Sequence, residues 1–333
     1  MSTKPTSKIF PFKTFISDLS TNLVPQSLLS SPENGAGGGR LVIVGDVHGM
    51  RKSLEELLRK VGFDKSKGDH LILVGDLVNK GPDSPGVVDL AIKLGASAVR
   101  GNHENAVLNA AVEINAAKDS PLPSGDFTGI SVGPENPEVD LPKDTVRDPE
   151  KPDKCASPTT RATALALSPH QIDWLAALPL ILRVKLPQDL ASPLGDTLIV
   201  VHAGLAPSTS LENQDTYAAM HMRSLIRTMG DEDKLIPSET SGEESWIMEW
   251  DRWQDSLSSK TTVIFGHDAK RRLQRSKYAI GLDSACLYGH KLSALVIGAS
   301  DGKIDHQVIQ VDCADVPVAP TISVKQGDKA VVG

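Results

Sequence analysis

Short apolar runs that end directly in polar residues recur along this chain, and they predict buried strands followed by loops. Each run has four or five residues, and most are rich in Val, Ile or Leu, with a Gly close to their carboxyl end. The runs are residues 41–44, 71–74, 97–100, 197–201 and 261–265. Ligands of open α/β sheets bind at the carboxyl ends of strands, so the residues that follow these runs are the first candidates for a functional site.

Between the first runs the apolar residues take helical spacing. Residues 51–61 place Leu54, Leu57, Leu58 and Val61 on one face, as in a helix packed on a sheet. Further helices are expected over residues 87–94 and 104–117. Ser168, followed by Pro169 and Gln171, predicts the start of another. The first part of the chain therefore predicts strand–helix–strand units with right-handed crossovers.

The second part of the chain has strands with shorter connections. Residues 181–186 and 197–201 read as paired strands, which predicts a second sheet packed on the first. We expect residues 279–283, 291–298 and 306–311 to complete that second sheet. A helix over residues 214–228 is expected to carry Arg223.

Three segments are predicted to lie outside the folded core. Residues 1–39 read as a flexible leader, residues 317–333 as a flexible tail, and residues 117–160 as a disordered insertion that holds 8 of the 22 prolines. Residues 40–316, which contain this insertion, are expected to form one folded domain. Neither a signal peptide nor a membrane span is recognised, so a cytoplasmic location is expected.

Composition narrows the class of protein. The net charge of −7 argues against bulk nucleic-acid binding. Three widely spaced cysteines suggest neither a disulfide framework nor a thiolate metal site. Aromatic residues make up only 4% of the chain, so the core is expected to be aliphatic.

Nitrogen and oxygen donors follow all five runs. These candidate ligands are Asp46, His48, Asp76, Asn102, His202 and His267. Carboxylate, amide and imidazole donors suit Mn, Fe, Zn or Co. Six donors exceed the need of one tetrahedral ion, and they fit two divalent ions that share a bridging carboxylate. The sequence therefore predicts a dinuclear metal site at the edge of the sheet.

The order of these motifs resembles that of the calcineurin-like metallophosphoesterases. Asp-x-His-Gly, Gly-Asp, Gly-Asn-His-Glu, His-Ala-Gly and Gly-His follow one another from residue 46 to residue 267. Lys80, followed by Gly-Pro-Asp-Ser, is similar to the ApaH-like phosphatases, whose fungal-type polyphosphatase branch matches best. The phosphoprotein phosphatases are more distant relatives. The resemblance implies an α/β fold of the αββα kind, a sandwich of two mixed sheets flanked by helices.

The resemblance also implies roles for single residues. One ion is expected on Asp46, His48 and Asp76, and the other on Asp76, Asn102, His202 and His267. A hydroxide between the ions would attack phosphorus in line, and His103 would donate a proton to the leaving group. The expected substrate-binding residues are Lys80, Arg223, Asn79, Tyr288 and Arg271, where Asn79 replaces a carboxylate of the phosphoprotein phosphatases.

The expected substrates are phosphoanhydrides. Inorganic polyphosphate is the first choice, because five of the eight residues from 270 to 277 are basic; a merely solvated surface is the alternative for this run. Dinucleoside polyphosphates and capped RNA remain open. So do a Ser/Thr phosphoprotein phosphatase and a metal-binding scaffold without turnover. Trp246, Trp250 and Trp253 share a helix face, for which we prefer core packing over base stacking.

Overall fold

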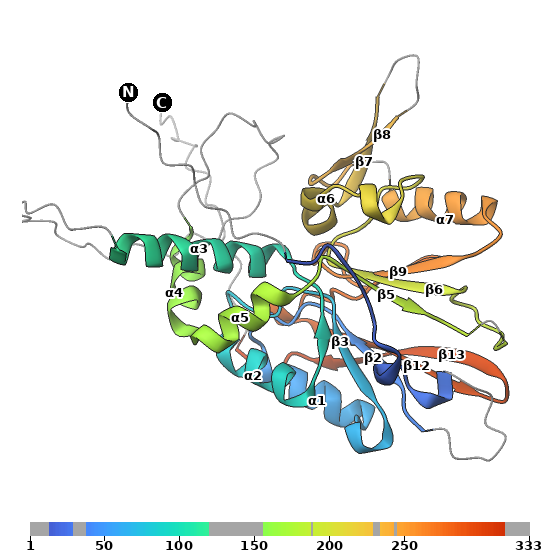
Figure 1. Ribbon diagram of the computed structural model, residues 1–333, viewed down its shortest axis with the longest axis horizontal. Helices are drawn as coiled ribbons and strands as arrows, with labels where there is room; N and C mark the ends of the chain where they lie inside the picture. Colours follow the sequence, from blue (N-terminus) through green and yellow to red (C-terminus); the bar gives the residue numbers. More distant parts are fainter. Residues whose placement is uncertain are drawn as a thin grey trace, which may run out of the picture.

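Two β-sheets pack face to face and carry helices on both outer surfaces (Figure 1). The computed structural model describes residues 13–28, 38–119, 156–187, 189–228, 234–242 and 245–316. Within these residues the fold is the predicted αββα sandwich.

The first sheet has five strands in the order β13-β12-β2-β3-β4. Its strands are β2 (Leu41–Val44), β3 (His70–Leu73), β4 (Ser97–Ala98), β12 (Lys291–Ser300) and β13 (Lys303–Asp312). Strands β2, β3 and β4 are parallel, whereas β12 runs antiparallel to β2. The carboxyl ends of β2 and β3 therefore meet at one edge.

The second sheet has six strands in the order β1-β5-β6-β9-β11-β10. They are β1 (Ile16–Asp18), β5 (Ile181–Lys185), β6 (Thr197–Val201), β9 (Thr261–Phe265), β10 (Gln274–Arg275) and β11 (Ala279–Gly281). Strands β6 and β9 are parallel neighbours, so they too deliver their following residues to one edge. A separate hairpin pairs β7 (Ser224–Arg227) with β8 (Leu235–Ser238).

Helices cover the two outer faces. The outer face of the first sheet is covered by α1 (Arg51–Val61), α2 (Ser84–Leu94), α3 (Asn102–Asp119), α4 (Pro158–Ala166) and α5 (Pro169–Ala177). On the second sheet pack α6 (Thr216–His221) and α7 (Trp246–Ser256). The predicted start of α5 is confirmed, because Ser168 and Gln171 form a reciprocal capping box.

The alternation of side chains along each strand separates three apolar layers. In β2, Val42 and Val44 pack under the helices, while Leu41 and Ile43 lie between the sheets. The outer layer of the second sheet contains Trp246 and Trp250, both nearly fully buried, and the Trp250 Nε1 donates to the Thr261 carbonyl at 3.1 Å. Core packing is thus confirmed for these two tryptophans, and base stacking by them is wrong.

The predicted sheet membership of the last strands is wrong. Strand β11 belongs to the second sheet, but β12 returns to the first sheet and β13 pairs with β12. Strand β12 has residues on both faces buried, with Leu295 and Ile297 between the sheets and Leu292 under the helices. Such a strand belongs in a sheet interior, and it fills the open side of β2.

The predicted flexible segments also need correction at their edges. Part of the supposed leader is built into the fold, because Ile16–Asp18 pair in parallel with β5, and Leu19 and Leu28 are buried. The supposed insertion begins and ends in helices, since α3 continues to Asp119 and α4 starts at Pro158. Residues 120–155, residues 1–12 and the predicted tail lie outside the described residues.

The helix predicted over residues 214–228 is much shorter. Helix α6 ends at His221, and Met222 is extended with ψ 142°. The Arg223 amide then donates to the Ser238 carbonyl at 2.7 Å, and β7 pairs with β8 from Ser224 onward. Pairing with a distant strand has overridden the local helical preference.

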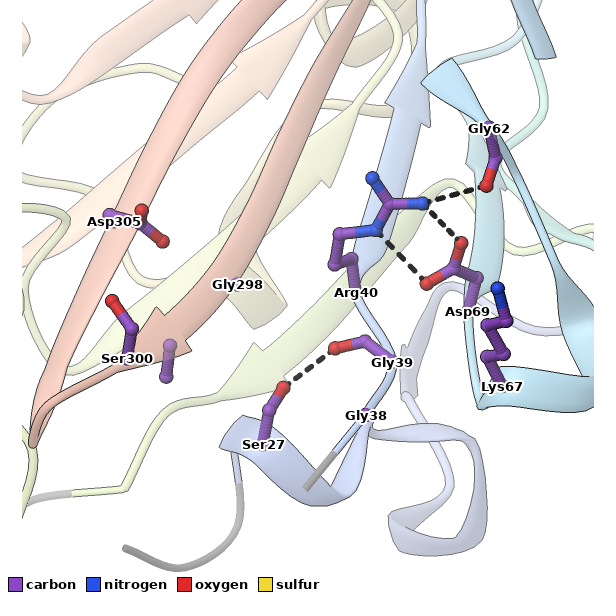
Figure 2. Close-up of a pocket in the computed structure, with 11 residues that line it drawn as sticks. Ser27, Gly38, Gly39, Arg40, Gly62, Lys67, Asp69, Gly298, Ser300 and Asp305 are labelled. Carbon is purple, nitrogen blue, oxygen red and sulfur yellow. Dashed lines mark hydrogen bonds and ion pairs between the residues drawn. The ribbon is translucent and has the colours of Figure 1, made fainter. Parts of the chain in front are cut away.

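At the amino ends of β2 and β3, Arg40 connects the start of β2 with the start of β3 and the end of helix α1 (Figure 2). Its guanidinium meets both oxygens of the buried Asp69, at 3.2 and 2.6 Å, and also donates to the carbonyls of Val61 and Gly62. Arg40, Gly62 and Asp69 line a hollow of about 470 Å³. It lies at the end of the strands opposite to the candidate ligands, and Arg40 is committed to structure there.

We expect Arg40→Ala to lower the free energy of unfolding by about 1–3 kcal/mol, because the buried Asp69 carboxylate loses its charged partner. Urea unfolding followed by circular dichroism measures this change. Lys67→Ala, at an exposed residue of the same hollow, should change stability by less than about 0.5 kcal/mol. Equal stabilities of the Arg40→Ala and Lys67→Ala variants would contradict this role.

None of the helices in the described part of the chain combines the length and the apolar character needed to cross a lipid bilayer.

Candidate metal centre

The polar residues after β2, β3, β6 and β9 converge at one edge of the sandwich. Their loops hold unusual backbone conformations, with positive φ at His48, Asp76, Asn79, Lys80 and His267. Two glycines make room for the carboxylates. A Cβ at Gly101 would lie 2.3 Å from Asp76 Oδ1, and one at Gly266 would lie 1.9 Å from Asp46 Oδ1. Strained backbone of this kind clusters at functional sites.

Asp76 lies between two groups of donors. Its Oδ1 is 3.4 Å from His202 Nε2, and its Oδ2 is 3.5 Å from His48 Nε2. One group comprises His48, Asp76 and His103, and the other comprises Asp76, His202 and His267. The Asp76 carboxylate therefore faces two sites with one oxygen each, as a bridging ligand would.

Hydrogen bonds orient the two imidazoles of the second group. His202 Nδ1 lies 3.0 Å from the Val74 carbonyl, and His267 Nε2 lies 3.1 Å from the His221 carbonyl. A carbonyl can only accept, so each of these nitrogens carries the hydrogen. The other two nitrogens, His202 Nε2 and His267 Nδ1, lie 3.2 Å apart and present lone pairs toward each other. Such an arrangement is typical of histidines that bind a metal.

The two remaining predicted ligands lie beside these groups. Asn102 Oδ1 is 2.9 Å from His202 Nε2, so it joins the second group. Asp46 is not part of either donor group found among the described residues. Both of its carboxylate oxygens instead accept from the His267 backbone amide, at 3.1 and 3.0 Å. Burial, with the charges of Asp283 and Asp76, raises the pKa of Asp46 well above its usual range.

Comparison with known proteins agrees with this arrangement. The model of the calcineurin-like phosphoesterase family matches residues 39–298. This range includes all five motifs, which run from residue 46 to residue 267. The chain belongs to the calcineurin-like phosphoesterase family. It is therefore a hydrolase of the metallophosphoesterase kind, and members of this family depend on two metal ions.

Several relatives of this phosphoesterase act on phosphoanhydrides according to their names. A zinc-dependent endopolyphosphatase of Saccharomyces cerevisiae is 28% identical over 283 residues, covering 82% of this chain and 81% of that protein. A symmetrical bis(5'-nucleosyl)-tetraphosphatase of Dechloromonas aromatica is 28% identical over 291 residues, covering 83% and 97%. A crystal structure assigned as a diadenosine tetraphosphatase is 31% identical with a TM-score of 0.58, covering 90% and 98%.

The donor set of this phosphoesterase fits metal ions. Five carboxylates of the described residues are buried around the edge: Asp46, Asp76, Glu104, Asp268 and Asp283. Burial raises the pKa of Asp283 to about 6 and that of Glu104 to about 7. Burial also disfavours the charge on Asp76, yet the His202, His103 and His48 rings hold its pKa well below its usual range. Bound cations would relieve this concentration of buried negative charge.

His103 lies directly beside the first group of donors. Its Nε2 is 3.9 Å from Asp76 Oδ2, and its ring meets His48 edge to face with centroids 4.9 Å apart. Its backbone amide donates to Asp76 Oδ1 at 3.0 Å, which fixes the start of α3 against the site. The predicted leaving-group donor is therefore adjacent to the predicted bridging ligand.

Two predicted substrate-binding cations act electrostatically on the site. The charge of Lys80 contributes to lowering the pKa of both His48 and His103, and that of Arg223 contributes to lowering the pKa of His267, although burial is the larger cause in each case. One Arg223 nitrogen donates to the Glu239 carbonyl at 3.1 Å. These cations therefore lie near opposite donor groups.

The other predicted substrate-binding residues differ in their surroundings. Arg271 is tied to Asp268 at 2.6 Å and donates to the Arg223 carbonyl at 3.0 Å, so it holds the Arg223 backbone in place. The pKa of the Tyr288 hydroxyl is raised, mainly by burial, and Tyr288 is packed against the apolar cluster under helices α1 to α5, as a residue of a packed turn would be. The Asn79 amide contacts the His103 ring and is buried, so it does not face solvent.

The contacts by which two further residues build the site could not be predicted from the sequence. The buried Glu104 accepts from the backbone amides of Asp76, Leu77, Val78 and Gly101, at 2.7 to 3.2 Å, and so holds the loop of the bridging carboxylate. The His221 carbonyl orients His267. The Gly-Asn-His-Glu motif drew attention to Glu104, but only coordinates reveal which amides it binds.

Proposed function

We propose that this phosphoesterase binds two divalent ions at the sheet edge and hydrolyses phosphoanhydride bonds. Asp46, His48 and Asp76 would hold one ion, and Asp76 would share the other with the residues Asn102, His202 and His267. The observation that carries the proposal is the Asp76 carboxylate, whose two oxygens face separate donor groups at 3.4 and 3.5 Å. When bound, the ion pair would lower the pKa of water and neutralise charge that develops on phosphate.

The protein's own side chains would orient the substrate. Arg223 offers a planar fork to two non-bridging phosphate oxygens, and Lys80 adds a compact positive charge on the side of His48. His103 would donate a hydrogen bond to the departing oxygen, which makes that oxygen a better leaving group. Arg271 would support phosphate binding indirectly, because its guanidinium donates to the Arg223 carbonyl and so fixes the Arg223 backbone.

Inorganic polyphosphate is the substrate class that we favour. The relatives named above act on polyphosphate or on dinucleoside tetraphosphate, and both contain phosphoanhydride bonds. In addition, the turn after His267 carries five basic residues among residues 270–277, in a chain whose net charge is −7. Arg271 is paired with Asp268 and Lys277 with Asp255. A linear polyanion leaving the metal centre along this segment would therefore meet chiefly Lys270, Arg272 and Arg275.

Zinc is the metal to test first, since the yeast relative is named as zinc-dependent. The donor set also suits Mn, Co or Fe, because it consists only of imidazole nitrogen and of carboxylate and amide oxygen.

Arg223→Lys is expected to lower kcat/KM for polyphosphate by roughly 10- to 100-fold, because an ammonium group cannot make two parallel hydrogen bonds to phosphate. Steady-state kinetics at fixed zinc concentration measure the change. Arg59→Lys, on the exposed surface of α1, is the matched control and should behave like the wild type. Equal kinetics for both variants would exclude Arg223 from phosphate binding.

A substrate panel tests the proposed function. Purified protein is incubated with polyphosphate, diadenosine tetraphosphate, capped RNA and a phosphoserine peptide, in the presence of Zn, Mn or Co, and phosphate or nucleotide release is measured. Preferred turnover of the anhydrides supports the proposal. Preferred turnover of the phosphopeptide would establish the phosphoprotein phosphatase instead, and metal binding without turnover of any compound would establish a scaffold.

A further inference from the structure

Asn79 lies between the His103 ring and a helix that is distant in the sequence. Its Nδ2 is 2.9 Å from His103 Nδ1 and also 2.9 Å from the Thr160 Oγ1 of helix α4. Asn79 is 1% exposed and Thr160 is 5% exposed, so water does not compete for these contacts. The hydrogen bonds therefore run from α4 through Asn79 to His103.

The neighbouring backbone fixes which end of the Asn79 amide faces the histidine. The Lys80 backbone N–H meets Asn79 Oδ1 at 2.9 Å, and a backbone N–H can only donate. The atom that it meets must be the oxygen, so the other end of the amide is the NH₂ group.

The NH₂ group has two hydrogens and two acceptors. One hydrogen points to Thr160 Oγ1, whose own hydroxyl pairs with Ser157 Oγ at 2.9 Å. The other points to His103 Nδ1, which must then present a lone pair. A neutral imidazole that accepts at Nδ1 carries its hydrogen on Nε2, and Nε2 is the nitrogen on the side of Asp76.

We propose that Asn79 and Thr160 are positioning residues that hold the His103 ring with its hydrogen on Nε2, aimed at the departing oxygen of the substrate. This inference rests on the proposed function for the place of the substrate. Thr160 completes the arrangement, because without its oxygen the second Asn79 hydrogen has no buried acceptor and chiefly the Lys80 N–H still holds the amide. A carboxylate in the place of Asn79 would accept from Nδ1 instead, and would favour a doubly protonated ring.

The arrangement has a consequence for substrate class. As the attacking water oxygen bonds to phosphorus and loses its proton to solvent, the bond to the leaving group breaks and its electron pair stays on the departing oxygen. The His103 Nε2–H then stabilises that oxygen by a hydrogen bond without giving up its only hydrogen. A hydrogen bond suffices for a weakly basic phosphate, whereas a strongly basic alkoxide needs a full proton. The site therefore suits anhydrides better than alkyl phosphates.

Nitrogen NMR of the full-length protein, labelled with ¹⁵N-histidine, tests the position of the hydrogen with and without zinc. We expect an unprotonated Nδ1 and a protonated Nε2 for His103 in the wild type. Thr160→Val should give mixed tautomers, Thr160→Ser should restore the wild-type pattern, and Arg161→Ala, at an exposed residue of the same helix, should leave it unchanged. A hydrogen on Nδ1 in the wild type, or an unaltered pattern in Thr160→Val, would overturn the inference.

Kinetics of Asn79→Asp test the consequence. The ratio of kcat/KM for an alkyl phosphate to that for tripolyphosphate should rise by at least about 10-fold in this variant, because the carboxylate supports a proton-donating ring. An unchanged ratio would overturn the link between Asn79 and substrate class. If the wild type turned over none of these compounds, the proposed function would fail, whereas the nitrogen spectrum would still decide where the hydrogen lies.

Discussion

Replacing His103 by alanine is expected to lower the kcat for polyphosphate by roughly 10²- to 10⁴-fold, the usual contribution of a positioned proton or hydrogen-bond donor. The reason is the place of His103 next to the bridging carboxylate, with Nε2 at 3.9 Å from Asp76 Oδ2. The metal content should stay at the wild-type value, since the six proposed ligands are retained. Stopped assays of phosphate release, with elemental analysis of the same samples, measure both quantities.

The control for this variant is His170→Ala, at an exposed residue in the first turn of α5. It should retain wild-type turnover. A His103→Ala enzyme that keeps full turnover would show that the leaving oxygen needs no help from this side chain. A His103→Ala protein that loses its metal would instead show that His103 is itself a ligand, which the group of His48, Asp76 and His103 allows geometrically.

Asp76→Asn is expected to reduce the bound metal from two ions to one or fewer per chain and to lower turnover by more than about 100-fold. Replacing a group that only supports a ligand already costs roughly 10- to 100-fold, and a shared ligand should cost more. The buried Asp76 carboxylate faces both donor groups, so its loss weakens both sites at once. Elemental analysis after dialysis measures the metal content.

Glu56→Gln, which removes an exposed carboxylate of α1, controls for the change of charge and should keep both ions. Thermal unfolding of both variants shows whether the fold survives. Two tightly bound ions in Asp76→Asn would rule out the bridging role, even if turnover fell.

The sequence was most informative where chemistry directly follows a strand. Asp76 comes three residues after β3, and His202 comes directly after β6, so each lies at the carboxyl end of its own strand. These strands belong to different sheets, and the packing of the two sheets brings both residues to one edge. The place of each candidate donor at a strand end is therefore predictable from the sequence, and so is the presence of two sheets.

Other features depend on long-range pairing, which local patterns do not encode. Strand β12 could pair with either sheet by its apolar content, and only its register against β2 decides the matter. Arg223 follows α6 by two residues but is positioned by the β7–β8 hairpin and by Arg271. Thr160 is 81 residues from Asn79 in the chain, and nothing in its local sequence distinguishes it from Thr159. Contacts of this kind become visible only when the fold is known.

The most direct test of the dinuclear centre is anomalous diffraction from crystals of the full-length protein grown with zinc or manganese. A dinuclear centre should give two anomalous peaks, one on each side of the Asp76 carboxylate. One peak is expected beside His48 and the other beside His202 and His267. A single peak, or peaks only at surface residues away from Asp76, would contradict a dinuclear centre.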